Sequence, residues 1–167
     1  MRYRRPAVLD WRSAVYAGIA AGILSTVVQI ALWAALTDAL PAVLYRDARF
    51  AAAIVMGPRA LPPPASFDWA VMSVATLVHL TLSLVYAFVL SALIARLRPP
   101  AALLAGAAFG LFVFGLNMYG FTTIFPWFEE DRDWITAAAH AAFGVIAAGV
   151  YEASAHGVRA RVEPGAC

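Results

Sequence analysis

Four stretches of this chain contain no charged side chain, and they limit what it can fold into. They lie between Arg12 and Asp38, between Asp68 and Arg96, between Arg98 and Glu129, and between Asp133 and Glu152. Each approaches or exceeds the roughly 17–25 residues that an α-helix needs to cross a hydrocarbon layer of about 30 Å, at about 1.5 Å per residue. The sequence therefore predicts four membrane-spanning helices.

The composition leads to the same fold class. Hydrophobic residues make up 63% of the chain, charged residues only 13%, and the mean hydropathy is +0.76, which is far from the balance of a soluble domain. We therefore expect an all-α membrane protein, a four-transmembrane-helix bundle, with residues 1–167 forming a single integral membrane domain. The expected spans cover about residues 13–36, 69–95, 101–125 and 134–155.

The arginines predict how the bundle is oriented. The segment before the first span, the link between spans two and three, and the segment after span four carry Arg2, Arg4, Arg5, Arg12, Arg96, Arg98, Arg159 and Arg161. By the positive-inside rule these three segments are cytoplasmic, and so are both termini. The opposite side has four arginines but seven acids. The pI of about 9.0 thus reflects membrane anchoring, and no nucleic-acid partner is expected.

The long outer segment between spans one and two divides into two parts. Residues 41–56 are expected to form an interfacial helix that lies on the membrane or caps the bundle. Its apolar stripe would comprise Leu44, Ala48, Ala51, Ala52 and Val55, with Arg46, Arg49 and Ala53 facing elsewhere. From Gly57 onward the glycine and the Pro62–Pro64 run predict an extended, semi-rigid return to span two.

Two of the spans begin with similar glycine-containing sequences. "AGIAAG" at residues 17–22 matches "AGAAFG" at 105–110, and each is followed by an amide residue, Gln29 or Asn117, seven positions after its second glycine. The two halves of the bundle could therefore be parallel-repeat hairpins. The glycine pairs are small-xxx-small patterns, which favour close helix packing within the chain or, alternatively, a dimer face.

A polar residue interrupts each of the four apolar runs: Gln29, His79, Asn117 and His140. Counted from the outer helix ends, all four fall in the outer half of the bilayer, within about one and a half helical turns of one another. Because an unpaired polar group in lipid costs a few kcal/mol, we expect all four to point inward as a buried polar layer. Tyr86, Tyr119, Thr122 and Thr123 could extend this layer.

Three roles for the polar layer are compatible with the sequence. Hydrogen bonds across helices could simply fix the register of the bundle. The layer could instead line a path for a solute or a proton, since intramembrane ionisable residues commonly mark such paths. As a third possibility His79 and His140 could ligate a b-type haem or a metal ion, although no cofactor is required by the sequence.

The outer loop before span four is rich in charge. It contains Glu129, Glu130, Asp131, Arg132 and Asp133. Such a run is typical of a solvated turn, and the alternative is that it attracts cations toward the polar layer. Asp133 and Asp68 each precede a tryptophan at an expected helix start, where an acid suits the helix N-terminus. Arg132 could pair locally or reach Asp47.

Several motifs resemble those of a known family. "GPRALPPPASFDWAVM" and "NMYGFTTIFPWFEEDRDWITAAAHAAFG" are similar to segments of small four-helix bacterial inner-membrane proteins of unassigned function, some of which are labelled "sodium:proline symporter". The similarity extends from about Trp11 to Tyr151. It implies a four-helix fold in a bacterial inner membrane and leaves the mechanism open, because true symporters of that name have many more spans and broken helices around a sodium site.

The residues point away from catalysis. No nucleophile–base pair, phosphate-binding loop or carboxylate dyad is evident, so we expect no enzyme. The leading hypothesis is a transport- or membrane-stress-related protein that uses the polar layer. The alternatives are a haem- or metal-binding redox protein and a structural partner of a larger membrane complex. The expected partners are the lipid bilayer and either a second copy or such a complex.

Overall fold

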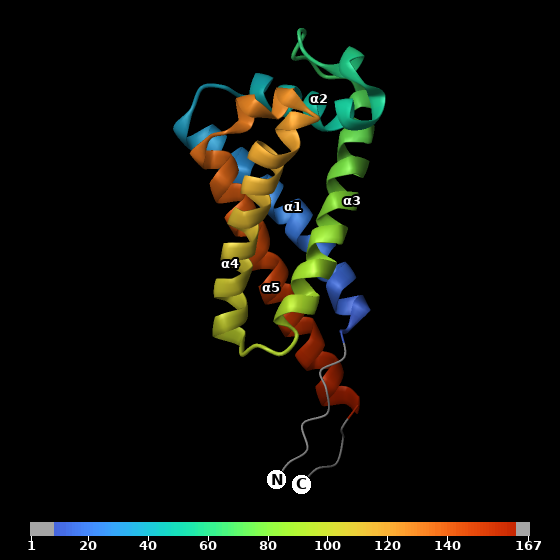
Figure 1. Cartoon of the computed structure of the whole chain (residues 1–167), viewed down its shortest axis with the longest axis vertical. Helices are drawn as coiled ribbons and strands as arrows, with labels where there is room; N and C mark the ends of the chain where they lie inside the picture. The colour runs from blue at the N-terminus through green and yellow to red at the C-terminus, as the bar shows by residue number, and fades with distance from the viewer. Residues whose placement is uncertain (1–8, 163–167) are drawn as a thin grey trace.

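The computed structural model describes residues 9–162, with side-chain surroundings up to Ala155, and within this range it contains helices and no strands. The helices are α1 (Trp11–Leu36), α2 (Ala42–Met56), α3 (Trp69–Ile94), α4 (Pro99–Gly115) and α5 (Trp134–Val162) (Figure 1). Shorter helical turns are η1 (Pro58–Ala60), η2 (Leu116–Gly120), η3 (Phe121–Thr123) and η4 (Pro126–Asp131).

Within the described residues, four helical segments are long and apolar enough to cross a membrane. They are Trp11–Leu36, Trp69–Ile94, Pro99–Thr123 and Trp134–Ala155. Their bounds differ by only a few residues from the expected spans, because the charged residues that delimit the apolar runs also lie at the helix ends. The prediction of an all-α bundle with four membrane-spanning helices is confirmed.

Aspartates begin three of the four long helices. The Asp68 carboxylate accepts hydrogen bonds from the Ala70 and Val71 amides at the start of α3, and Asp133 accepts from Ile135 and Thr136 at the start of α5. Asp10 does the same for α1 by accepting from the amide of Arg12. These carboxylates accept hydrogen bonds from amides that have no acceptor within the helix. The Asp–Trp dipeptides predicted this for α3 and α5.

Helix α5 lies at the centre of the packing. It contacts α1 and α4 along much of its length, whereas α3 packs mainly against α1 and meets α4 and α5 only lightly (Figure 1). The core, to which all four spanning helices contribute, is built largely of alanines, together with Tyr151 of α5 and Leu90 of α3. Because α3 is so loosely joined to α4, the bundle is least tightly packed on the side between these two helices.

The paired glycines bring helices together within the chain. A Cβ atom added at Gly106 would overlap the carbonyl oxygen of Gly144, and one added at Gly110 would overlap that of His140. In the other hairpin, Gly18 and Gly22 face α3 less tightly, with Leu84 and the Ser83 side chain as their nearest neighbours. The two hairpins thus share this contact, but α5 also packs broadly against α1 while α3 barely meets α4, so their arrangement is not symmetric.

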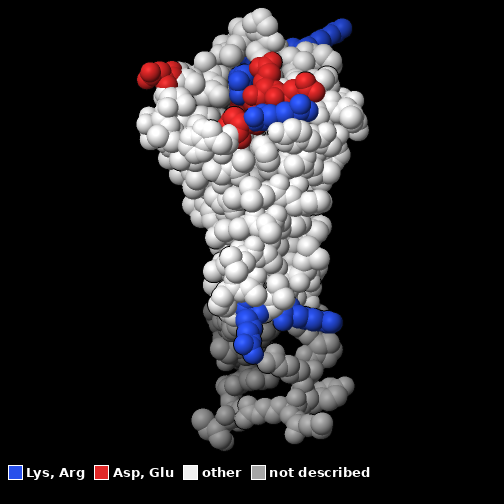
Figure 2. Space-filling view, turned by 60° about the vertical axis from the view of Figure 1, so that its left-hand side comes forward, with Lys and Arg blue, Asp and Glu red and all other residues white. Residues whose placement is uncertain are grey.

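Charge separates the two ends of the molecule. Helix α2 and η4 lie at one end, and the start of α1, the α3–α4 turn and the end of α5 lie at the other (Figure 1). Figure 2 shows acidic and basic side chains gathered at the first end, an uncharged band below, and basic side chains beyond the band. The exposed indoles of Trp69 and Trp134 lie where α3 and α5 begin, at the α2 end. This distribution fits a membrane-spanning band with an aromatic boundary.

Helix α2 buries a different face from the one expected. Arg49, Phe50, Ala52 and Ala53 are buried, whereas Val55 is 69% exposed. The expected apolar stripe was therefore wrong for Val55 and for the two residues assigned to the other face, Arg49 and Ala53. The cause is a pair of hydrogen bonds, because the Arg49 guanidinium donates to the carbonyl oxygens of Ala60 and Ser66 in the segment that follows. These bonds turn that side of α2 inward.

Candidate functional site

A pocket of about 150 Å³ lies between the four spanning helices. All four residues of the predicted polar layer line it: Gln29 from α1, His79 from α3, Asn117 from η2 and His140 from α5. Hydroxyl groups of Ser25, Thr26, Ser83 and Tyr86 join them, and so do apolar side chains such as Leu82 and Phe143. The structure thus brings the four polar residues together, as counting from the helix ends indicated.

A chain of hydrogen bonds connects α3, η2 and α5 across the pocket. The Tyr86 hydroxyl donates to Asn117 Oδ1 at 2.7 Å, and Asn117 Nδ2 lies 3.5 Å from His140 Nε2. The other ring nitrogen of His140, Nδ1, donates to the carbonyl oxygen of Thr136 at 2.8 Å. Tyr86 therefore extends the polar layer, whereas Tyr119 is exposed and packs under Arg132 instead.

His79 was expected to be buried, and this was wrong. Its side chain is exposed, and the pocket is not enclosed. Nothing from α4 covers this side because α3 and α4 meet only lightly, a property that depends on helix spacing and not on local sequence. The ring nevertheless has partners on α1: Nε2 lies 3.1 Å from the Gly22 carbonyl oxygen and 3.2 Å from Thr26 Oγ1.

Asn117 sits in an irregular segment where an unbroken helix was expected. The third span is α-helical to Gly115, forms a π-helical turn at Leu116–Gly120 and ends in the 3₁₀ turn Phe121–Thr123. Short π-helical turns often occur at functional sites, because they redirect a side chain by inserting one residue. Arg132 stabilises this irregular end by donating to the Met118 carbonyl oxygen at 2.7 Å and to Thr122 Oγ1 at 2.9 Å.

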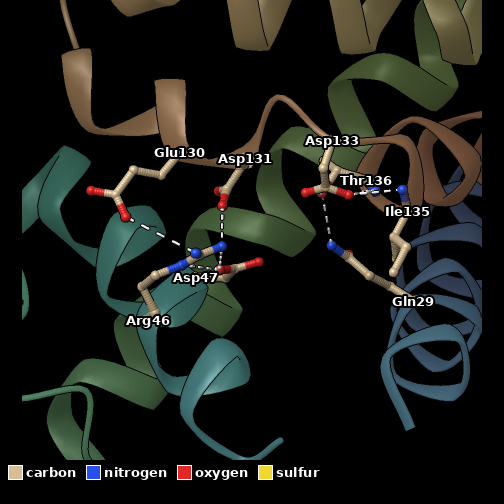
Figure 3. Close-up of polar contacts among 8 residues, drawn as sticks. All are labelled: Gln29, Arg46, Asp47, Glu130, Asp131, Asp133, Ile135 and Thr136. Carbon is tan, nitrogen blue, oxygen red and sulfur yellow. Dashed lines mark hydrogen bonds and ion pairs between the residues drawn. The ribbon is translucent and has the colours of Figure 1, made fainter. Parts of the chain in front are cut away.

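Polar groups continue from the pocket to the outer end of the bundle. Gln29 Nε2 donates to Thr136 Oγ1 at 3.4 Å, and that hydroxyl donates to Asp133 Oδ2 at 3.0 Å (Figure 3). The same threonine supplies the carbonyl oxygen that accepts from His140. Thr136 therefore joins two of the pocket residues to the carboxylate at the start of α5, a role that the sequence analysis did not assign.

Above this connection lies a charged cluster that ties α2 to η4. The Arg46 Nη2 atom is 2.6 Å from Asp131 Oδ1 and 2.9 Å from Asp47 Oδ1, and Nη1 lies 4.0 Å from Glu130 (Figure 3). Next to these contacts, the Trp127 indole donates to the Phe50 carbonyl oxygen at 3.1 Å. We call this set of contacts between α2 and η4 the outer latch.

The interpretation of the outer loop as a solvated turn was wrong at one residue. Glu129, Glu130 and Arg132 are exposed, but Asp131 is only 4% exposed because α2 covers it. Arg132 pairs locally with Glu129 at 3.3 Å, while Arg46 is the arginine that reaches Asp47. Arg46 and Asp131 are 85 positions apart, and no local pattern in the sequence could have joined them.

The latch carboxyls are held in an unusual environment. Burial raises the pKa of Asp131 to about 8, and the neighbouring Asp47 carboxylate adds to the rise while Arg46 opposes it. Burial likewise raises the pKa of Asp47 to about 6 against the attraction of Arg46. Two carboxyls so close together cannot both ionise easily, and they therefore retain a proton at a pH where isolated aspartates have lost theirs.

Only a few atoms of the pocket could ligate a metal ion. His79 and His140 each use one ring nitrogen to contact a backbone carbonyl, which leaves the other nitrogen of each ring as a candidate ligand. No group of three or more histidine, cysteine or acidic residues is arranged around a possible metal position within the described part of the chain. A haem would need far more space than 150 Å³, since even drug-sized ligands occupy pockets of about 300–1,000 Å³.

Comparisons with protein-family models, with curated proteins and with solved structures found no match to this chain.

Proposed function

We propose that this chain is a small transport-related membrane protein whose pocket binds a small polar solute on its way across the bilayer. The observation that carries the proposal is that polar side chains from all four spanning helices line one pocket. Gln29, His79, Asn117 and His140 lie in the outer half of otherwise apolar spans, where an unpaired polar group is costly. If these residues only fixed the packing of the helices, hydrogen bonds between neighbouring helices would be enough and no open pocket would be needed.

The volume of the pocket limits the size of the solute that can bind. A water molecule needs roughly 10–15 Å³ of such space, so the pocket holds several waters or one small polar molecule. The hydrogen-bonded connection through Thr136 to Asp133 provides polar groups between the pocket and the α2 end. These features support passage of a small solute better than binding of a large cofactor.

The same proposal includes location and orientation. We place the protein in a bacterial inner membrane with both termini cytoplasmic, in line with the family that its motifs resemble. Arg12 lies at the start of α1 and Arg96 and Arg98 lie in the α3–α4 turn, at the end that would face the cytoplasm, whereas the outer latch lies at the opposite end (Figure 1). The positive-inside rule supports this orientation over the reverse one.

A flux assay tests the proposed function. The protein would be reconstituted into liposomes, and the entry of urea and of glycerol would be followed by stopped-flow light scattering. We expect flux above that of protein-free liposomes, and a fall of at least about fivefold in the Asn117→Leu variant, which removes a polar contact and fills space. Thr81→Val is the matched control, because Thr81 is an exposed α3 residue whose hydroxyl bonds only to its own helix.

Other outcomes would point elsewhere. Equal flux in protein liposomes and protein-free liposomes for urea, for glycerol and for methylammonium chloride would contradict the proposal. If Asn117→Leu lowered only the resistance to unfolding, the polar residues would serve packing. A reduced-minus-oxidised absorption spectrum and a metal determination on the same preparation address the redox alternative, in which haem or metal would be lost on replacing His79 or His140.

A further inference from the structure

Each of the two pocket histidines has one ring nitrogen that can only accept a hydrogen bond. His140 Nδ1 is 2.8 Å from the Thr136 carbonyl oxygen, and His79 Nε2 is 3.1 Å from that of Gly22. A carbonyl oxygen accepts and never donates, so each of these nitrogens carries the ring hydrogen. In the neutral rings the remaining nitrogens, His140 Nε2 and His79 Nδ1, must therefore be acceptors.

The neighbouring hydroxyl groups have already used their hydrogens. Tyr86 donates to Asn117, and Ser25 and Thr26 both donate to the Gly22 carbonyl oxygen. Among the described residues none donates to His79 Nδ1. The Asn117 amide approaches His140 Nε2 only at 3.5 Å, the outer limit for such a bond. Both imidazole acceptors are thus open to a better donor.

The Ser83 hydroxyl is a third group that a molecule bound in the pocket could contact. Ser83 lines the pocket and is only 4% exposed, yet its hydroxyl has no hydrogen-bond partner among the described residues. Its oxygen is not one of the fully buried atoms that lack a partner, so it is accessible from the pocket and free to bond water or a bound molecule. This oxygen can accept a hydrogen bond from a molecule that also contacts the histidines.

We propose that the pocket binds a small protonated amine, ammonium or a primary alkylammonium ion. This rests on the proposed function and names its solute. An ammonium group offers three or four N–H donors and no acceptor, which complements two imidazole nitrogens and a free hydroxyl. Two further features lower the cost of placing a cation there: the aromatic rings of Tyr86 and Phe143 line the pocket, and the α2 end of the molecule carries an excess of acids.

Nitrogen NMR on the whole chain tests the proposal without any substitution. The protein would be placed in lipid nanodiscs at pH 8 with ¹⁵N-labelled histidine side chains and titrated with methylammonium chloride. We expect saturable shifts of the acceptor nitrogens of two of the three histidines, His79 and His140, with His156 as the internal reference. Tetramethylammonium chloride, which has the same charge but no N–H donor, should leave all three unchanged.

Variants then locate the site. His79→Phe and Ser83→Ala should each weaken the apparent affinity for methylammonium by at least about tenfold, the scale of one lost hydrogen bond to a charged group. Thr81→Val should leave the affinity unchanged. Equal responses to the two salts, or no response to methylammonium, would overturn the proposal even if urea or glycerol flux is observed. Saturable binding without any flux would uphold this proposal and overturn the proposed function instead.

Discussion

Three glycines, Gly106, Gly110 and Gly144, set the distance between α4 and α5. Their Cα atoms lie against backbone of the facing helix, with no room for even a methyl group. Where lipid replaces water there is little hydrophobic drive between helices, so such close packing contributes much of the association energy. Gly110 also faces the backbone of His140, which links helix packing directly to the pocket.

Replacing Gly110 by alanine should separate the two helices. The new methyl group would collide with the His140 carbonyl oxygen, and overpacking of this kind costs about 1–3 kcal/mol. We expect the Gly110→Ala variant to unfold at a lower fraction of sodium dodecyl sulfate in mixed micelles, followed by circular dichroism. Gly115→Ala is the control, because a Cβ atom there meets open space. Equal effects of the two substitutions would show that the close approach is not required.

At the scale of elements, two sets of arginine contacts hold the outer segments in place. The outer latch joins α2 to η4 through Arg46, and Arg132 binds the irregular end of the third span, where it occupies carbonyl and hydroxyl oxygens. Both arginines reach across loops and donate to oxygen atoms of other segments. Each therefore helps to position an element above the pocket by a polar contact, which in the latch is added to the packing of Phe50 against Phe128.

The latch should make stability depend on pH. In the unfolded chain Asp131 would lose its proton near its ordinary pKa of 3.8, whereas in the folded chain it keeps the proton up to about pH 8. Between these values folding takes up a proton, so stability falls as the pH rises from about 4 to 8 and levels off above. Asp47, whose pKa is raised to about 6, adds to the fall between about pH 4 and 6.

We therefore expect the thermal midpoint of the detergent-solubilised protein to rise as the pH is lowered from 8 to 5. The Asp131→Asn variant should show a much flatter dependence, because its amide stays neutral throughout. Asp38→Asn, at an exposed position in the same outer segment, should keep the wild-type slope. A wild-type midpoint that rises with pH over this range would mean that Arg46 holds Asp131 in its ionised form.

Arg132 should control the irregular end of the third span. Replacing it by alanine removes the donors to the Met118 carbonyl oxygen and to Thr122. We expect faster amide hydrogen exchange over residues 116–123, with little change in the middle of α4. Arg59→Ala serves as the control, since Arg59 is exposed on η1. Unchanged exchange in the Arg132→Ala variant would mean that the π-helical turn is held by the backbone alone.

At the scale of the whole molecule, the number of membrane spans and the depth of the polar residues could be predicted, because both depend on contiguous stretches of sequence. The charge-free stretches set the four spans, and counting from Trp69 and Trp134 placed His79 and His140 in the outer half of the bilayer, about one helical turn apart in depth. The sequence could not predict the pairing of Arg46 with Asp131, which depends on how α2 folds back over the bundle. Nor could it predict the exposure of His79, which follows from the loose contact between α3 and α4.

The orientation of the molecule can be checked with its single cysteine, Cys167, which lies outside the described residues. If both termini are cytoplasmic, a membrane-impermeant maleimide should label Cys167 only after intact bacterial cells are opened. In a Cys167→Ala background, Ala65→Cys should be labelled in intact cells, because Ala65 is exposed in the outer segment. Labelling of Cys167 in intact cells would reverse the proposed orientation.

The central position of α5 has a consequence for how the protein is made. Of the spanning helices α5 comes last along the chain, so α1, α3 and α4 enter the membrane before the helix that packs most broadly among them exists. During that interval Gln29 and Asn117 lack their contacts to Thr136 and His140. The three earlier helices, two of which carry a side chain that lacks its α5 partner, must therefore wait, either beside the insertion machinery or loosely associated in lipid, until α5 completes the bundle.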